Sequence, residues 1–229
     1  MLRLENALCR QGDFALQLSM ELPAGARLAL LGASGSGKST LLNVIAGFSW
    51  LDTGQILLAG QDHTRSPVAE RPVSVIFQDS NLFPHLTVFQ NVALGLEPSL
   101  RLSETQKGEV LQALDRVGLG KMQDRLPGTL SGGQQSRVAL ARMLVMERPA
   151  VLMDEPFAAL DPSLRRSMAE LVGELTQERG TTLILVTHDL RDVRDLASHL
   201  AVLDEGKLVL MGDTPTLLAK PPDALMPWL

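Results

Sequence analysis

The sequence predicts an α/β domain in which helices cover a largely parallel β-sheet. Short apolar runs at residues 150–153, 181–186 and 200–203 read as buried strands, and segments with helical periodicity separate them. Alternation of apolar strands with helices is typical of a parallel sheet covered on its faces. A glycine-rich loop at residues 32–39 also lies directly between an apolar strand and a helix, which is the setting of a phosphate-binding loop.

Length and composition fit one such domain. The chain has 229 residues, of which 45% are hydrophobic, enough for a sizeable core. No apolar run reaches the roughly 18–20 residues that span a bilayer, and no secretory signal is expected at the N-terminus. The single cysteine, Cys9, excludes an internal disulfide and fits a reducing compartment. The net charge of −5 and the 3% aromatic content argue against nucleic acid as the main partner.

The first third of the chain is expected to be mostly strand. Apolar residues alternate from Phe14 to Leu22, so one face of that strand should be buried. The helix predicted at residues 38–46 should end at Gly47. The expected strands are residues 2–8, 14–22, 27–31, 54–59 and 73–77.

The middle of the chain is expected to form a helical subdomain, about residues 86–146, inserted in the core. Its expected helices are residues 87–94, 103–117 and 134–146, and Ser103 with Gln106 has the spacing of a capping box. No internal repeat occurs, so residues 1–229 should hold one nucleotide-binding domain. Strands should return at residues 150–153, 181–186, 200–203 and 207–210, with helices at 162–178, 189–197 and 214–219, and with a loose proline-rich tail at 220–229.

The glycine-rich loop matches the pattern GxxxxGK[ST]. Its backbone N–H groups and the following helix N-terminus should bind the phosphates of ATP, Lys38 should reach the β- and γ-phosphates, and Ser39 should hold Mg²⁺. The alternative is an ordinary glycine-rich turn, which the flanking strand and helix disfavour. The expected ATP-binding residues here are Gly32, Ala33, Ser34, Gly35, Ser36, Gly37, Lys38, Ser39 and Thr40.

Two carboxylates, Asp154 and Glu155, end the apolar strand at residues 150–153. Adjacent side chains on a strand point to opposite faces, so the two can take separate roles. Asp154 should hold Mg²⁺ through a water, and Glu155 should orient and deprotonate the attacking water. The alternative is an acidic helix start before Pro156.

A second anion site is expected in the sequence Leu-Ser-Gly-Gly-Gln, at Ser131, Gly132, Gly133 and Gln134. Free N–H groups at a helix N-terminus attract an anion. Ser131 is also a good N-cap, and the two roles are compatible. One ATP does not need two phosphate sites in one chain, so this site should serve the ATP of a second copy in a two-fold, head-to-tail homodimer.

These three motifs, in this order, resemble those of the ATP-binding-cassette (ABC) ATPases over nearly the whole chain. Gln78 in Val-Ile-Phe-Gln resembles the Q-loop, Asp161 in Ala-Ala-Leu-Asp resembles the D-loop, and His188 in Val-Thr-His-Asp resembles the switch histidine. The resemblance implies an ABC cassette of the P-loop NTPase class, with a RecA-like core, an N-terminal antiparallel β subdomain and an α-helical subdomain. It also implies that Gln78 contacts Mg²⁺ and water and relays to a membrane partner, that Asp161 lines the dimer seam, and that His188 touches the γ-phosphate.

Residues 71–88 are similar to the same stretch of bacterial importer ATPases for small solutes, and residues 60–64 and 91–96 resemble those of thiamine importers. This resemblance implies ATP and Mg²⁺ as cofactors, and a homodimer on the cytoplasmic face of the bacterial inner membrane. The implied partners are integral membrane permease subunits and a periplasmic solute-binding protein, with no nucleic acid. Permease docking is expected at residues 78–86 and on the helical subdomain, with Leu82, Phe83 and Leu86 as exposed anchors. Packing within the subdomain is the alternative for these three.

One departure from the family concerns adenine. The family usually stacks an aromatic on adenine near residue 11, where this chain has Gln11 and contains no tyrosine. Phe14 could substitute, although its alternation with Leu16 and Leu18 favours a core role.

Other functions remain open from the sequence. They are an ABC ATPase for another solute, an exporter, a non-transport ABC clamp and a small-molecule kinase. The clamp is disfavoured because no coiled-coil insertion or second cassette is present. The kinase is disfavoured because Leu-Ser-Gly-Gly-Gln and His188 would then have no role.

Overall fold

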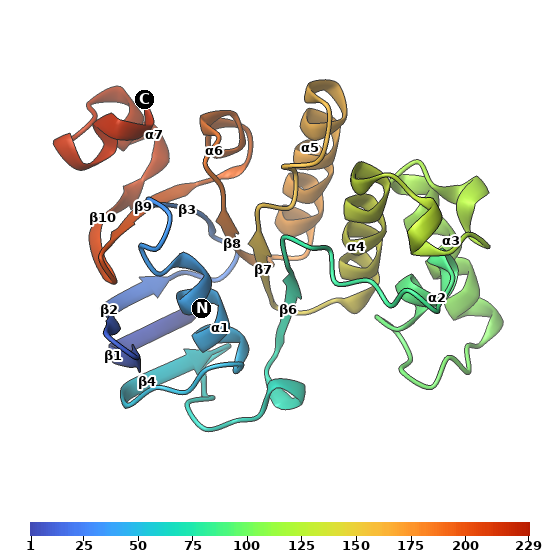
Figure 1. Ribbon diagram of the computed structural model, residues 1–229, viewed down its shortest axis with the longest axis horizontal. Helices are drawn as coiled ribbons and strands as arrows, with labels where there is room; N and C mark the ends of the chain where they lie inside the picture. Colours follow the sequence, from blue (N-terminus) through green and yellow to red (C-terminus); the bar gives the residue numbers. More distant parts are fainter. The chain divides into compact units, whose positions relative to one another are not determined.

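The computed structural model describes residues 1–229, which divide into two compact units. Unit 1 comprises Met1–Val73, Arg148–Asp154 and Ala169–Leu229, and unit 2 comprises Ser74–Glu147 and Glu155–Met168. Figure 1 shows their elements. None of the helices combines the length and the apolar character that crossing a bilayer requires.

Unit 1 begins with an antiparallel sheet in the order β2-β1-β4-β5. The strands are β1 (Leu2–Gln11), β2 (Phe14–Leu22), β4 (Thr53–Leu58) and β5 (Gln61–Asp62). Leu16, Leu18, Met20 and Leu22 are buried while the residues between them are exposed, so the alternation predicted for β2 is confirmed.

The second sheet of unit 1 carries the phosphate-binding loop. Its strands follow the order β10-β9-β3-β8-β7 (Figure 1). The central strand β3 (Arg27–Leu31) pairs in parallel with β8 (Thr182–Val186) and β9 (His199–Asp204). Strand β7 (Ala150–Asp154) is parallel to β8, whereas β10 (Lys207–Asp213) is antiparallel to β9. Leu28 to Leu31 are all buried, as expected for a strand covered on both faces.

Short helices complete unit 1. Helix α1 (Lys38–Ala46) ends at Gly47 as predicted, with Gly47 in the left-handed conformation that suits glycine. The other elements are η1 (Val68–Glu70), α6 (Leu190–Leu196), α7 (Thr214–Ala219) and η4 (Asp223–Trp228). Helix α5 (Pro162–Glu178) runs from unit 2 into unit 1.

The C-terminal tail is not loose, and that expectation was wrong. Residues 223–228 form the 3₁₀ helix η4, and Leu225 is completely buried. Leu225 packs in a cluster with Leu31 of β3 and Val193 of α6. The prolines prevent an α-helix here, but the apolar residues between them still reach the core.

In unit 2, two other helices pack against α4 (Gly132–Met146). They are α2 (Val88–Ala93) and α3 (Glu104–Arg116), and α4 contacts both. The predicted capping box of Ser103 and Gln106 is confirmed. Gly95 permits close helix packing, since a Cβ there would lie 2.8 Å from the Arg142 carbonyl oxygen. The unit also includes η2 (Gly120–Met122), η3 (Pro127–Thr129) and β6 (Val73–Ile76) after its first residue.

A buried arginine secures the C-terminus of α1. Arg71 is 1% exposed, and its Nη1 donates to the carbonyl oxygens of Val44 (2.7 Å) and Ile45 (2.9 Å). Its Nε donates to the Ser66 carbonyl at 3.1 Å, and burial lowers the pKa of the guanidinium. The positive charge therefore lies where the helix dipole is negative and where backbone carbonyls lack helical partners.

Replacing Arg71 by methionine is expected to lower the free energy of unfolding by about 2–4 kcal/mol, because buried carbonyls would lose a charged donor. Urea denaturation followed by circular dichroism measures the change. Arg65 is exposed in the same loop, so Arg65→Met serves as the matched control and should be nearly neutral. Equal stability of the Arg71 and Arg65 variants would contradict the proposed role of Arg71.

Candidate nucleotide-binding and catalytic site

The phosphate-binding loop joins β3 to α1. Gly37 is the N-cap of α1 in a left-handed conformation (φ 104°), and no side chain caps the helix. The first N–H groups of α1 are therefore available to an anion. Lys38 Nζ donates to the carbonyl oxygens of Gly32 and Ala33, each at 2.8 Å. The ammonium thus lies over the loop that is predicted to hold the phosphates.

The turn between β9 and β10 supports this loop. Gly206 N–H donates to the Ser36 carbonyl at 2.9 Å, and the Gly206 carbonyl accepts from Gln17 N–H at 2.7 Å. Gly206 has φ 76°, and a Cβ there would collide with the Ala15 carbonyl oxygen. Sequence reasoning missed this role, because the only local signal is a glycine in a short turn.

The two residues predicted to hold Mg²⁺ in unit 1 lie together. Ser39 is in the first turn of α1 and Asp154 ends β7, and Ser39 Oγ donates to Asp154 Oδ2 at 3.1 Å. Mg²⁺ prefers hard oxygen ligands and is commonly bound by one or two protein groups with waters and substrate phosphates. A hydroxyl and a carboxylate beside a phosphate-binding loop fit that chemistry.

His188 follows β8, the strand beside β3. It is exposed, and its neighbours are firmly held: Thr187 Oγ1 donates to Asp192 Oδ2 at 2.6 Å. Asp189 caps α6 by accepting from Arg191 N–H at 2.8 Å. Because β3 and β8 are parallel, His188 follows the strand end at the same sheet edge as the phosphate-binding loop.

The remaining predicted catalytic residues belong to unit 2. Gln78 is exposed two residues after β6. Glu155 follows Asp154 directly but has left β7, since its backbone is left-handed (φ 47°). A non-glycine residue in this conformation stores strain, which is common at functional sites.

Ser131 is the N-cap of α4, which confirms the capping role predicted from the sequence. Its Oγ accepts from Gln134 N–H at 3.3 Å, and Gln134 Oε1 accepts from Ser131 N–H at 2.9 Å. Ser131 and Gly132 are exposed. At Gly133 a Cβ would lie 3.0 Å from the Ala159 carbonyl oxygen, so the D-loop segment packs closely against this motif. The second anion site remains a prediction.

Asp161 caps α5. Its Oδ1 accepts from Leu164 N–H at 3.0 Å and from Ser163 Oγ at 2.7 Å, and these hydrogen bonds lower the pKa of the carboxyl. Its place at a dimer seam stays a prediction.

Near the position expected for adenine, Gln11 Nε2 donates to Ser49 Oγ at 3.2 Å. Phe14 is half-buried, and a Cβ on Gly37 would lie 2.7 Å from its Cζ. Phe14 therefore packs against the phosphate-binding loop.

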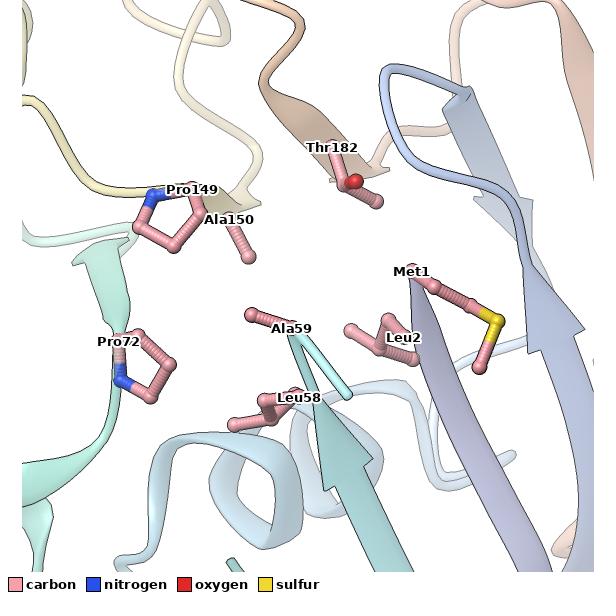
Figure 2. Close-up of a pocket in the computed structure, with 8 residues that line it drawn as sticks. All are labelled: Met1, Leu2, Leu58, Ala59, Pro72, Pro149, Ala150 and Thr182. Atoms are coloured by element: carbon pink, nitrogen blue, oxygen red, sulfur yellow. The ribbon is translucent and has the colours of Figure 1, made fainter. Parts of the chain in front are cut away.

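A small pocket of about 20 Å³ in unit 1 lies apart from these motifs (Figure 2). Eight mostly apolar residues line it, among them Leu58, Pro149 and Thr182. Thr182 Oγ1 already accepts from Gly25 N–H at 3.2 Å. The pocket contains none of the predicted site residues and is too small for a nucleotide.

Comparison with known proteins identifies the family. Residues 16–158 match the family described as ABC transporter. The thiamine import ATP-binding protein ThiQ of Jannaschia sp. (strain CCS1) is 54% identical, with both chains fully covered. The protein of the same name from Escherichia coli (strain K12) is 44% identical over 96% of this chain and 94% of that protein.

Solved structures agree with this assignment. The dimeric bacterial ABC transporter cassette MJ0796 is 29% identical, with a TM-score of 0.85 over 93% of this chain and 99% of that one. A dimeric post-hydrolysis state of the same cassette, bound to ADP and Pi, matches equally well. The expected fold class is thus confirmed, and the chain belongs to the ABC transporter family as one of its ATP-binding cassettes.

Proposed function

We propose that this chain is the ATP-hydrolysing subunit of an importer that brings thiamine into the cell. The observation that carries the proposal is similarity over the full length to thiamine import ATP-binding proteins, up to 54% identity. The contact between Ser39 and Asp154 supports ATP hydrolysis, because two oxygen ligands for Mg²⁺ meet beside the phosphate-binding loop.

In this proposal each motif residue has one task. Lys38 leaves the carbonyls of its own loop and binds the β- and γ-phosphates, while Ser39, and Asp154 through a water, would hold Mg²⁺. When bound, the ion offsets negative charge on the phosphates. Glu155 accepts a proton from the attacking water, and Gln78 and His188 orient the water and the γ-phosphate.

Two copies assemble head to tail, so that each ATP lies between Lys38 of one copy and Ser131 of the other. The exposed N-terminus of α4 supports this arrangement, because the N–H groups of Gly132 and Gly133 can face an anion there, whereas that of Gln134 is capped by Ser131. The similar cassette MJ0796 is dimeric.

The permease docks on residues 80–87, which we call the docking loop. Phe83 is 44% exposed, whereas Leu82 and Leu86 are half-buried. Only one of the three predicted anchors is therefore exposed. Through this contact the chain is peripheral on the cytoplasmic face of the inner membrane, and a periplasmic binding protein delivers thiamine to the permease.

Uptake of labelled thiamine tests this function. In cells that lack the chain and any other thiamine importer, the wild type should restore uptake at low thiamine concentration. Glu155→Gln should not restore it, because hydrolysis would stall. Restoration by Glu155→Gln would disprove the catalytic assignment, and uptake that does not depend on the chain would leave another solute or export as the function.

A further inference from the structure

Two consecutive residues of the docking loop have strained backbones. Ser80 (φ 58°) and Asn81 (φ 42°) are both left-handed, and neither is glycine. Ser80 N–H donates to the Phe77 carbonyl at 2.9 Å, and Asn81 N–H donates to the Asp79 carbonyl at 2.7 Å. Ser80 and Asn81 lie two and three residues after Gln78, so the shape of this turn fixes where the docking loop starts. Asparagine adopts this conformation more readily than serine, but two successive residues with a Cβ in it need surrounding contacts that hold them.

Arg142 of α4 supplies those contacts. Its Nη1 donates to the Asn81 carbonyl at 3.0 Å, and its Nη2 donates to the Ser80 carbonyl at 3.2 Å. Burial lowers the pKa of the guanidinium, although an arginine keeps its charge at neutral pH. The planar fork of arginine presents two donors at a fixed separation, which suits two adjacent carbonyls. Ser80 itself is buried at 5% exposure.

The rest of the loop is held by Asn91 of α2, which is completely buried. Its Oδ1 accepts from Phe83 N–H at 2.8 Å. Its Nδ2 donates to the carbonyls of Phe83 (3.1 Å), Leu86 (3.0 Å) and Thr87 (3.0 Å). The exposed Phe83 is thus presented on a fixed loop rather than a mobile one. In the same way, Arg142 holds the strained turn at Ser80 and Asn81, which precedes the part of the loop held by Asn91.

We propose that Arg142 is a positioning residue that holds Ser80 and Asn81 in their left-handed shape and so sets the docking loop for coupling to the permease. The proposal rests on the proposed function, since coupling requires the permease. Arg142 lies on the same helix as Ser131, about 16 Å along its axis at 1.5 Å per residue. Arg142, which supports the docking loop, and Ser131, which is expected to face the second ATP, are therefore parts of one rigid helix.

The test uses Arg142→Met in two settings. In the isolated chain, amide hydrogen exchange at residues 79–83 should become about tenfold faster, while basal ATP hydrolysis stays within about twofold of wild type. In the complex assembled with permease and thiamine-binding protein, thiamine-stimulated hydrolysis should fall about tenfold. Arg116→Met removes an exposed arginine from the same unit and should change none of these values.

A second substitution separates positioning from simple packing. Glycine adopts left-handed backbone without strain, so Ser80→Gly with Asn81→Gly, added to Arg142→Met, should restore most of the slow exchange and most of the stimulation. Arg142→Lys should be intermediate, because one ammonium lacks the fork. Unchanged exchange and stimulation in Arg142→Met, or no recovery with the glycines, would overturn the proposal. A wild-type complex without thiamine stimulation would instead refute the proposed solute, while exchange in the isolated chain would still decide the role of Arg142.

Discussion

Replacing Glu155 by glutamine is expected to slow ATP hydrolysis by about 100- to 10,000-fold while ATP binding stays close to wild type. The amide has nearly the shape of the carboxylate but cannot accept the proton of the attacking water. The phosphate-binding groups, Lys38 and Ser39, are untouched by the change. With hydrolysis stalled, the ATP-bound dimer should accumulate.

Single-turnover hydrolysis gives the rate, nucleotide titration gives the affinity, and size-exclusion chromatography with ATP gives the dimer fraction. Glu174 is exposed on α5, so Glu174→Gln controls for the loss of one negative charge. Hydrolysis by Glu155→Gln at the wild-type rate would show that another group deprotonates the water.

Replacing Ser131 by arginine is expected to reduce hydrolysis to below about one-hundredth of the wild-type rate, although each chain should still bind ATP. The added side chain would occupy the exposed N-terminus of α4, where the γ-phosphate of the second copy's ATP is expected. ATP binding should persist because Lys38 and Ser39 lie in unit 1, whereas Ser131 lies in unit 2.

A matched variant distinguishes the steric effect of the arginine side chain on the expected γ-phosphate site from the loss of the helix cap. Ser131→Ala removes the hydroxyl that accepts from Gln134 N–H, at a cost of about 1 kcal/mol, but adds no bulk. Hydrolysis should therefore fall far less in Ser131→Ala than in Ser131→Arg. Wild-type activity of the arginine variant, measured over a range of protein concentrations, would exclude the head-to-tail dimer.

Sequence reasoning succeeded where the signal is local. The boundaries of α1 follow from the phosphate-binding pattern and from Gly47, and the capping box of Ser103 follows from a spacing of three residues. Ser39 and Asp154 are each predicted to hold Mg²⁺ from their own motif, and the structure brings the two side chains into contact.

It failed where a contact joins distant parts of the chain. Nothing near Arg71 in the sequence shows that its partners are the carbonyls of α1, about 26 residues earlier. Gly206 resembles an ordinary turn glycine in the sequence, because its contacts with β2 and with the phosphate-binding loop come from distant parts of the chain. The buried place of Leu225 depends on β3 and α6, which a local pattern of prolines does not reveal.

The central position of β3 has a consequence for synthesis on the ribosome. Both neighbours of β3 in the sheet, β8 and β9, begin about 150 residues or more after it ends. At roughly 5–20 residues per second, the nascent chain carries an unpaired apolar strand for about 8–30 s before β8 emerges. During that interval β3 has two open edges that can pair with other chains, so newly made protein should depend on chaperones until its last third is complete.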